Sequence, residues 1–211
     1  MVQIRNLKTP SLSIAYEEDG PKKGKPLLLL HGWPVSPRMW DKVVPLLHEA
    51  GYRTIAPYLR GYGLSRFRRS FWRRKPRRTG QPVAFAQDMI DLADRLGLKR
   101  FPFVGHDWGA LAGYALAALF PQRLQSLVAI SVPFEPGEPA PPPFPQARAF
   151  WYQWLFCSKP GEKKFREDPV TYGKAQWDVW SPPGWYTPEQ FAETARSWKG
   201  KDFQDVEYST A

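Results

Sequence analysis

The amino-acid sequence predicts an α/β fold in which helices cover both faces of a mostly parallel sheet and a helical segment follows. Short apolar runs alternate with helical patterns as far as residue 132, which is typical of such a sheet. The run Pro26–Leu30 has no period-two alternation, as expected of a strand buried on both faces. Beyond residue 145 the pattern is aromatic and helical, with no strand-like run.

Local signals predict each element in order. The turn Thr9-Pro10-Ser11 separates two strand-like runs, so an opening antiparallel hairpin is expected. The first half of the sheet then comprises strands over 2–7, 12–17 and 26–30, a helix over 39–47 that Gly51 ends, and a strand over 52–56. The pattern repeats with a helix over 83–96, a strand over 101–104, a helix over 108–120 and a strand over 127–132.

The distribution of prolines predicts the domain boundaries. Prolines crowd the chain between residues 133 and 145, which is typical of a stiff linker. We therefore expect an incomplete core over residues 1–134, a proline-rich linker over 135–145 and a helical cap segment over 146–211.

Composition limits the class of protein. A chain of 211 residues with 43% hydrophobic content can bury one good core. The single cysteine, Cys157, excludes an intramolecular disulfide and a zinc site built from cysteines. The N-terminus has no apolar leader, and no stretch reaches the roughly 18 apolar residues of a membrane span. We expect a cytoplasmic protein with no membrane partner, no metal and no cofactor.

The net charge of +10 is concentrated in one segment. Eight basic residues lie between residues 66 and 78: Arg66, Arg68, Arg69, Arg73, Arg74, Lys75, Arg77 and Arg78. Interleaved Phe67, Phe71 and Trp72 would suit single-stranded nucleic acid, on which aromatic side chains stack. Blocks of like charge are more commonly solvated loops. We therefore expect an exposed excursion with no nucleic-acid role.

The segment Gly105-His106-Asp107-Trp108-Gly109 joins a predicted strand to a predicted helix. Glycines two places before and after the centre are typical of a nucleophile elbow, a turn so tight that only a small residue fits at its flanks. The central residue is normally Ser; here it is Asp107. The alternative is an ordinary helix N-cap, for which Asp is also common.

An aspartate suits nucleophilic chemistry at saturated carbon. A carboxylate has an unperturbed pKa of about 3.9, so at neutral pH it can attack without a base to deprotonate it. The product is an alkyl ester of the protein. Hydrolysis of that ester needs a water activated by a base and an oxyanion hole for the tetrahedral intermediate.

Three motifs in order carry a family resemblance: His31-Gly32-Trp33-Pro34, then Arg60-Gly61-Tyr62-Gly63-Leu64-Ser65, then the elbow. This order resembles the epoxide hydrolase and haloalkane dehalogenase branch of the α/β-hydrolase superfamily, over about residues 25–134. Residues 152–156 and 160–162 are similar to the cap stretch that holds a ring-opening tyrosine in epoxide hydrolases. The resemblance implies an α/β-hydrolase fold with a partial helical cap.

Site residues follow from these motifs. The backbone N–H groups of Trp33 and Trp108 are expected to form the oxyanion hole, within the loop of His31, Gly32 and Pro34. Pro34 has no N–H and can only shape that loop. Gly105, His106 and Gly109 belong to the elbow, and Tyr152 is a candidate proton donor that could instead simply pack.

The histidine of such an enzyme has no counterpart here. In the superfamily the order is nucleophile, acid, histidine, and none of His31, His48 and His106 follows Asp107. Ser131 stands where some relatives place the acid, and Glu135 is only a weak substitute. Either the chain is truncated or it is an inactive relative; if the given chain folds, we expect it to form the ester without turnover.

The leading functional hypothesis is an epoxide hydrolase in which Asp107 attacks a ring carbon and Tyr152 protonates the leaving oxygen. A haloalkane or haloacid dehalogenase using the same ester is the close alternative, with Trp33 and Trp108 as halide-holding indoles or mere pocket walls. An inactive small-molecule-binding relative is the third. Trp33-Pro34 replaces the Asn common in dehalogenases, which favours epoxides. The expected substrate is small and hydrophobic; the sequence indicates no oligomeric state.

Overall fold

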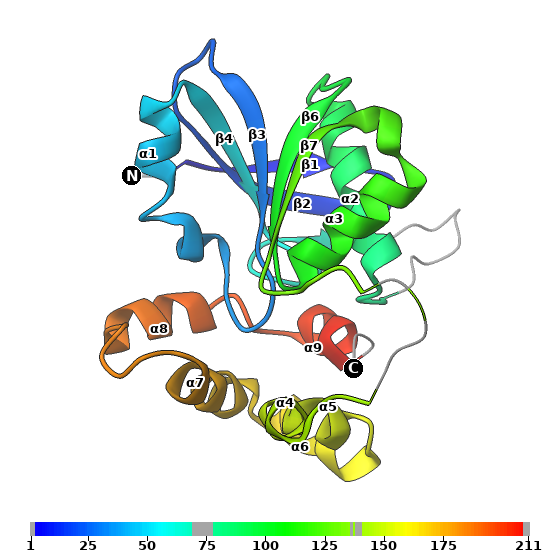
Figure 1. Ribbon diagram of the computed structural model, residues 1–211, viewed down its shortest axis with the longest axis vertical. Helices are drawn as coiled ribbons and strands as arrows, with labels where there is room; N and C mark the ends of the chain where they lie inside the picture. Colours follow the sequence, from blue (N-terminus) through cyan, green and yellow to red (C-terminus); the bar gives the residue numbers. More distant parts are fainter. Residues whose placement is uncertain (1–2, 69–77, 136, 138–140, 209–211) are drawn as a thin grey trace.

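The computed structural model describes residues 3–68, 78–135, 137 and 141–208. Its centre is a seven-stranded sheet in the order β1-β2-β4-β3-β6-β7, with β5 paired to β2 (Figure 1). The strands are β1 (Gln3–Lys8), β2 (Leu12–Asp19), β3 (Lys25–Leu30), β4 (Tyr52–Pro57), β5 (Arg66–Phe67), β6 (Phe101–His106) and β7 (Leu124–Ile130). The run β4-β3-β6-β7 is parallel, and the confirmed opening hairpin joins it through antiparallel β2.

Helices lie on both faces of the sheet, as the sequence predicts (Figure 1). The short α1 (Val44–Glu49) packs on β4, whereas α2 (Pro82–Arg95) and α3 (Trp108–Leu119) pack together on the opposite face. Short 3-10 helices, η1 (Pro37–Trp40) and η2 (Pro121–Arg123), precede α1 and β7.

Two sequence expectations are wrong in detail. A single helix over 39–47 is replaced by η1 and α1, because Pro45 lacks the N–H that a helix interior needs and fits only in a first turn. The last strand begins at Leu124 and not at Leu127, directly after η2, and ends before Ser131, whose φ of 74° is incompatible with a strand.

The burial of β3 on both faces confirms the reading of its continuous apolar run. Leu28 and Leu30 belong to the main core, which includes Phe85 and Met89 of α2. Leu27 and Leu29 point the other way, into a smaller cluster with Trp40 and Ala56. Successive side chains of a strand alternate between its faces, so a strand between two layers must be apolar throughout.

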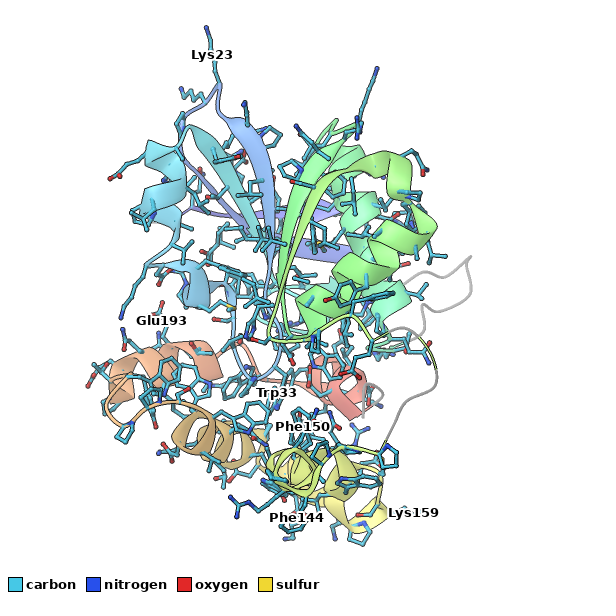
Figure 2. All side chains as sticks on the ribbon, viewed as in Figure 1. Lys23, Trp33, Phe144, Phe150, Lys159 and Glu193 are labelled. Atoms are coloured by element: carbon cyan, nitrogen blue, oxygen red, sulfur yellow. The ribbon has the colours of Figure 1, made fainter. Side chains whose placement is uncertain are left out.

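Six helices form a layer across one end of the sheet (Figure 1). They are α4 (Phe144–Ala149), α5 (Trp151–Phe156), α6 (Lys159–Glu167), α7 (Pro169–Trp180), α8 (Pro188–Ala195) and α9 (Lys201–Tyr208). Their core is aromatic and is formed by Phe156, Phe165, Trp177, Phe191, Trp198 and Phe203. The Trp177 indole donates to the Pro34 carbonyl at 2.7 Å, and Figure 2 shows Trp33 at the boundary with these helices.

The ends of the basic segment are exposed but bonded to the protein. Arg68 donates to the Thr9 carbonyl, and Arg78 forms an ion pair of 2.7 Å with Asp202. Residues 69–77 lie outside the described residues, so the expected excursion and its lack of a nucleic-acid role stay predictions. In the part of the chain that is described, no helix has the length and apolarity to cross a membrane.

The packing of α3 on the sheet predicts a difference between two of its glycines. A Cβ on Gly109 would lie 2.2 Å from the Leu30 backbone oxygen, which cannot move without displacing β3. A Cβ on Gly113 would instead meet the end of the Leu127 side chain, at 2.6 Å, which can rotate. Gly109→Ala should lower the free energy of unfolding by about 3 kcal/mol. Gly113→Ala should change it by less than about 1 kcal/mol, because the gain in helix propensity offsets the crowding.

Urea unfolding of both variants, followed by far-ultraviolet circular dichroism, measures this difference. Equal destabilisation by the two substitutions would contradict the assignment of the tight contact to Gly109.

Candidate functional site

Asp107 occupies a strained turn between β6 and α3. Its backbone dihedrals are φ 55° and ψ −115°, and its side chain makes no capping hydrogen bond to α3. A positive φ is rare outside glycine and persists only where the surroundings enforce it. A Cβ on Gly105 would lie 2.0 Å from the Gly109 carbonyl oxygen, so the strand and helix meet more closely than other residues allow. Asp107 therefore stands at the N-cap position of α3 without capping it through its side chain, and the turn has the geometry of an elbow.

Two backbone amides converge on the Asp107 carboxylate. The Trp33 N–H donates to Oδ1 at 2.9 Å, and the Trp108 N–H also bonds this group. A Cβ on Gly32 would lie 2.2 Å from Oδ1, so only glycine lets the loop after β3 come this close. Burial raises the pKa of Asp107 to about 6, while the two amide bonds act to lower it. The two amides thus already bond the carboxylate that would become an ester on Asp107. The carbonyl oxygen of such an ester would need these hydrogen-bond donors.

His31 fixes the loop that carries Trp33. It is fully buried; its Nε2 accepts from the Leu59 N–H at 3.1 Å, so its proton resides on Nδ1, which donates to the Gly32 carbonyl at 2.9 Å. Burial lowers its pKa to about 3, so the ring is neutral at physiological pH. At the end of the loop, a cis peptide bond joins Trp33 to Pro34, and the Pro34 carbonyl accepts a hydrogen bond from the Trp177 indole N–H. The loop is therefore held from the core and from the cap.

Tyr152 lies on α5 within reach of the charge of Asp107. Its ring packs edge-on against Phe150 and Trp180, and the residue is 5% exposed. Burial, and then the charge of Asp107, raise the pKa of the phenol well above its ordinary value. The side chain therefore packs in the aromatic layer within reach of the charge of Asp107, and its role as a proton donor stays a prediction.

The site contains two residues that the sequence did not assign. The Tyr62 hydroxyl donates to Oε1 of Glu207 on α9, and the Tyr62 ring stands edge-on to His31 at 5.0 Å. Burial raises the pKa of Glu207 to about 8, and the charge of Asp107 contributes in the same direction. Tyr62 lies within the Arg60 to Ser65 motif, which was a usable signal. Glu207 carries no such signal, because it stands in no recognised pattern.

A buried ion pair supports the loop of Tyr62. Arg60 binds Asp88 of α2 through two hydrogen bonds of 2.7 Å, and it also donates to the carbonyls of Thr79 and Ala84. A bidentate guanidinium–carboxylate pair with its remaining donors satisfied fixes both partners in direction as well as distance. The pair therefore anchors the end of β4 to α2, next to the site.

The structure places the remaining candidate side chains in different surroundings. His48 of α1 bonds Thr54, and Glu135 is exposed. His106 is half-buried, with a pKa lowered by burial, and is not among the groups that shift the pKa of Asp107. The indole N–H groups of Trp33 and Trp108 are buried and have no hydrogen-bond partner in the described structure. Within the same residues, no cluster of His, Cys, Asp and Glu suits a metal ion.

The buried acid predicts a pH-dependent stability. The folded pKa of Glu207, about 8, exceeds its ordinary value of 4.5, so between these values the folded protein holds a proton that the unfolded chain releases. Stability from this group is therefore complete below pH 4.5 and is lost as the pH rises through 8. Glu207→Gln should be more stable than the wild type at pH 9 and should lose this advantage at pH 4.

Thermal melts at the two pH values measure the effect, with Glu193→Gln as the control because Glu193 is exposed on α8 (Figure 2). A gain in melting temperature that is the same at both pH values would argue against a raised pKa for Glu207.

Comparison with known proteins agrees with this geometry. A family model described as the alpha/beta hydrolase fold matches residues 25–160. A fluoroacetate dehalogenase from a Burkholderia species is 34% identical over 83% of this chain and 58% of its own length. Epoxide hydrolase 3 of Siraitia grosvenorii is 35% identical over 72% of this chain and 47% of its own length. The chain thus spans about half the length of these curated relatives.

Solved structures extend the match over nearly the whole chain. A candidate epoxide hydrolase from Klebsiella pneumoniae is 36% identical, with a TM-score of 0.88, over 98% of this chain and 68% of that one. The epoxide hydrolase CorEH is 26% identical, with a TM-score of 0.80, over 100% of this chain and 74% of that one. With its elbow, its amide pair and its matching family model, this chain belongs to the α/β-hydrolase family, among relatives that include epoxide hydrolases and a fluoroacetate dehalogenase.

Proposed function

We propose that this chain forms an alkyl ester between Asp107 and a small, neutral, largely apolar substrate, as the first step of epoxide hydrolysis. The observation that carries the proposal is the convergence of the Trp33 and Trp108 amides on the Asp107 carboxylate, opposite Tyr152. Epoxide hydrolases among the relatives support the substrate class.

The residues divide the work as follows. An oxygen of Asp107 attacks a ring carbon, and the C–O bond of the ring breaks toward the ring oxygen. Tyr152 hydrogen-bonds that oxygen as its charge develops. In the ester, the Asp107 carbonyl oxygen lies at the two amides, which are the donors that a tetrahedral intermediate needs when water attacks. His31, Gly32 and Pro34 hold the loop of Trp33, and Gly105, His106 and Gly109 form the elbow.

The charge of the site favours a neutral substrate. Among the described residues, burial and two backbone amides account for the pKa shift of Asp107, with no cationic side chain. Glu207 also supplies no positive charge. An anionic substrate, such as the one named for the Burkholderia relative, would face the Asp107 carboxylate without a cationic partner, which is unfavourable in a buried site. A neutral epoxide has no such cost.

Carbon–halogen cleavage is the second candidate, favoured by one observation. The buried indole N–H groups of Trp33 and Trp108 lack hydrogen-bond acceptors in the described structure, and a departing halide would accept from both. The same ester on Asp107 would form.

The setting and organisation of the chain complete the proposal. We infer a cytoplasmic location, because the only cysteine, Cys157, is exposed and a reducing environment preserves an exposed thiol. We also retain the division into a core over residues 1–134, a linker over 135–145 and a cap segment over 146–211.

No histidine follows Asp107 in this sequence, so this chain should form the ester faster than it hydrolyses it.

The test is covalent labelling of Asp107. Styrene oxide in excess should add one hydroxyphenylethyl group to the tryptic peptide 101–123, which holds Asp107, as measured by mass spectrometry. Asp107→Asn should abolish the adduct, because the amide is a poor nucleophile. Benzyl bromide should label the same residue if the second candidate also holds, with release of one bromide per adduct.

Controls make the result specific. Cys157 is exposed and reacts with both reagents, so the experiment uses a Cys157→Ala background. Circular dichroism of Asp107→Asn establishes that it is folded. A folded wild type that forms no adduct with either reagent would exclude ester chemistry and favour an inactive binding protein.

A further inference from the structure

A chain of contacts connects helix α2 to the Asp107 carboxylate through the core of the protein. It begins at the ion pair of Arg60 with Asp88, which are 6% and 2% exposed and are joined by two hydrogen bonds of 2.7 Å. Arg60 directly follows Leu59, whose backbone N–H donates to Nε2 of His31 at 3.1 Å. A buried acid of α2 is thereby connected to the loop after β3.

The second part of this chain of contacts runs along a single peptide group. Nδ1 of His31 donates to the Gly32 carbonyl at 2.9 Å. This carbonyl and the Trp33 N–H belong to the same planar peptide, so a bond that holds the oxygen also fixes the direction of the N–H. The Val35 N–H bonds the same oxygen more weakly, at 3.3 Å. On the other side of the peptide, the Trp33 N–H donates to Oδ1 of Asp107 at 2.9 Å.

The turn over residues 58–62 holds His31 through three contacts. One is the bond from the Leu59 N–H, and the others are the rings of Tyr58 and Tyr62, which stand edge-on to the imidazole at 6.4 and 5.0 Å. Within the turn, the Tyr62 N–H donates to the Leu59 carbonyl at 3.0 Å. Burial lowers the pKa of His31 to about 3, so Nε2 remains an acceptor at neutral pH. The position of the imidazole therefore follows the position of this turn.

The buried pair of Arg60 and Asp88 determines where the turn lies. Arg60 also donates to the carbonyls of Thr79 and Ala84, at 3.0 and 2.9 Å. Four hydrogen bonds at one guanidinium fix its direction as well as its distance. A buried ion pair adds little stability relative to apolar residues of similar volume, because both charges lose water. What this pair supplies to the fold is a defined position for the turn that holds His31.

We propose that the buried pair, acting through His31, orients the Trp33 N–H toward the Asp107 carboxylate. These are positioning residues, because they act on an amide and not on the substrate. Their chemical role rests on the proposed function, in which the Trp33 amide faces the carbonyl oxygen of the ester. The positioning itself is a property of the free protein, so it can be measured without a substrate.

The test is the response of two tryptophan amides to the ionisation of Asp107. In protein labelled with ¹⁵N-tryptophan, the backbone signals of Trp33 and Trp108 are assigned by Trp33→Phe and Trp108→Phe. Both amide protons should shift downfield as Asp107 ionises, with a midpoint at about pH 6, because a carboxylate is the stronger acceptor. Both shifts should vanish in Asp107→Asn. This variant separates them from the titration of Asp88, whose pKa burial also raises to about 6.

Two variants interrupt the chain of contacts at different points. His31→Leu removes both ring nitrogens. Arg60→Met together with Asp88→Leu removes the buried pair without leaving an unpaired charge. Each variant should make the Trp33 shift much smaller than in the wild type. The Trp108 shift should persist, because Trp108 begins α3 and does not belong to the loop after β3.

Conservative and matched changes separate orientation from bulk. His31→Gln offers an acceptor and a donor in place of the ring nitrogens, so it should restore part of the Trp33 shift. Arg60→Lys keeps the charge but lacks the planar fork, so it should lose part of the shift even if the pair-free variant does not fold. Arg123→Met with Asp94→Leu is the control, because this pair of 2.6 Å also involves α2; it should leave both shifts unchanged.

The same variants should change how ester formation depends on pH. The Trp33 bond lowers the pKa of Asp107, so its loss raises that pKa and leaves less carboxylate at low pH. Labelling by styrene oxide should therefore fall about five-fold at pH 6 and match the wild type near pH 9, where Asp107 is ionised in every variant. Tyr62, Tyr152 and Glu207, whose charges interact with Asp107, are the same in all of them.

The outcomes separate this inference from the proposed function. An unchanged Trp33 shift in His31→Leu or in the pair-free variant would show that the loop orients its amide without these residues. Loss of the Trp108 shift as well would mean that the elbow has moved, so that the role is only structural. Equal losses in His31→Leu and His31→Gln would assign the effect to the volume of the ring. If the shifts behave as expected but the folded wild type forms no adduct with styrene oxide or benzyl bromide, the positioning stands and the proposed function fails.

Discussion

Close packing of backbone at the elbow is the constraint on which the rest of the site depends. A Cβ at Gly105 would overlap the Gly109 carbonyl, one at Gly109 would overlap the Leu30 carbonyl, and one at Gly32 would overlap the Asp107 carboxylate. Strand β6, helix α3 and the loop after β3 can meet at these distances only because the side chains are absent. This approach forces the positive φ of Asp107 and brings the Trp33 amide to 2.9 Å from its carboxylate.

The constraint determines the electrostatics of the site as well as its shape. A carboxylate under a layer of aromatic helices loses water, which raises its pKa, and the two amides return part of that solvation. Glu207 is buried nearby and experiences both the loss of water and the charge of Asp107. Two interacting acids with separated pKa values hold one proton between them near neutral pH.

The layer of helices α4 to α9 covers the loop of Trp33 with apolar side chains. Its aromatic core comes down on the loop of Trp33, where Trp177 bonds the Pro34 carbonyl and Trp198 packs on the Trp33 ring. The surroundings of Asp107 in the described residues are therefore apolar groups, phenols and an acid, without a cation. The names of two relatives, a fluoroacetate dehalogenase and an epoxide hydrolase, refer to chemically different substrates.

The sequence by itself determined the parts of the protein that depend on neighbours in the chain. The elbow, the loop of His31 to Pro34 and the doubly buried strand β3 follow from the spacing of glycines and apolar residues, because short-range sterics and alternation dictate them. The break between η1 and α1 at residues 41–43 could also have been predicted from Pro45. The helical spacing of the apolar residues suggested one continuous helix instead.

Only the tertiary structure decided how distant residues complete the site. Glu207 stands in no motif, and its partner Tyr62 precedes it by 145 residues, so no local period relates them. Tyr152 was ambiguous because packing and proton donation need the same aromatic residue, and only the structure shows that its ring packs on Trp180 within reach of the charge of Asp107. Burial is the largest cause of the raised pKa values of Asp107 and Glu207. Desolvation depends on the assembled fold, and a sequence pattern does not specify it.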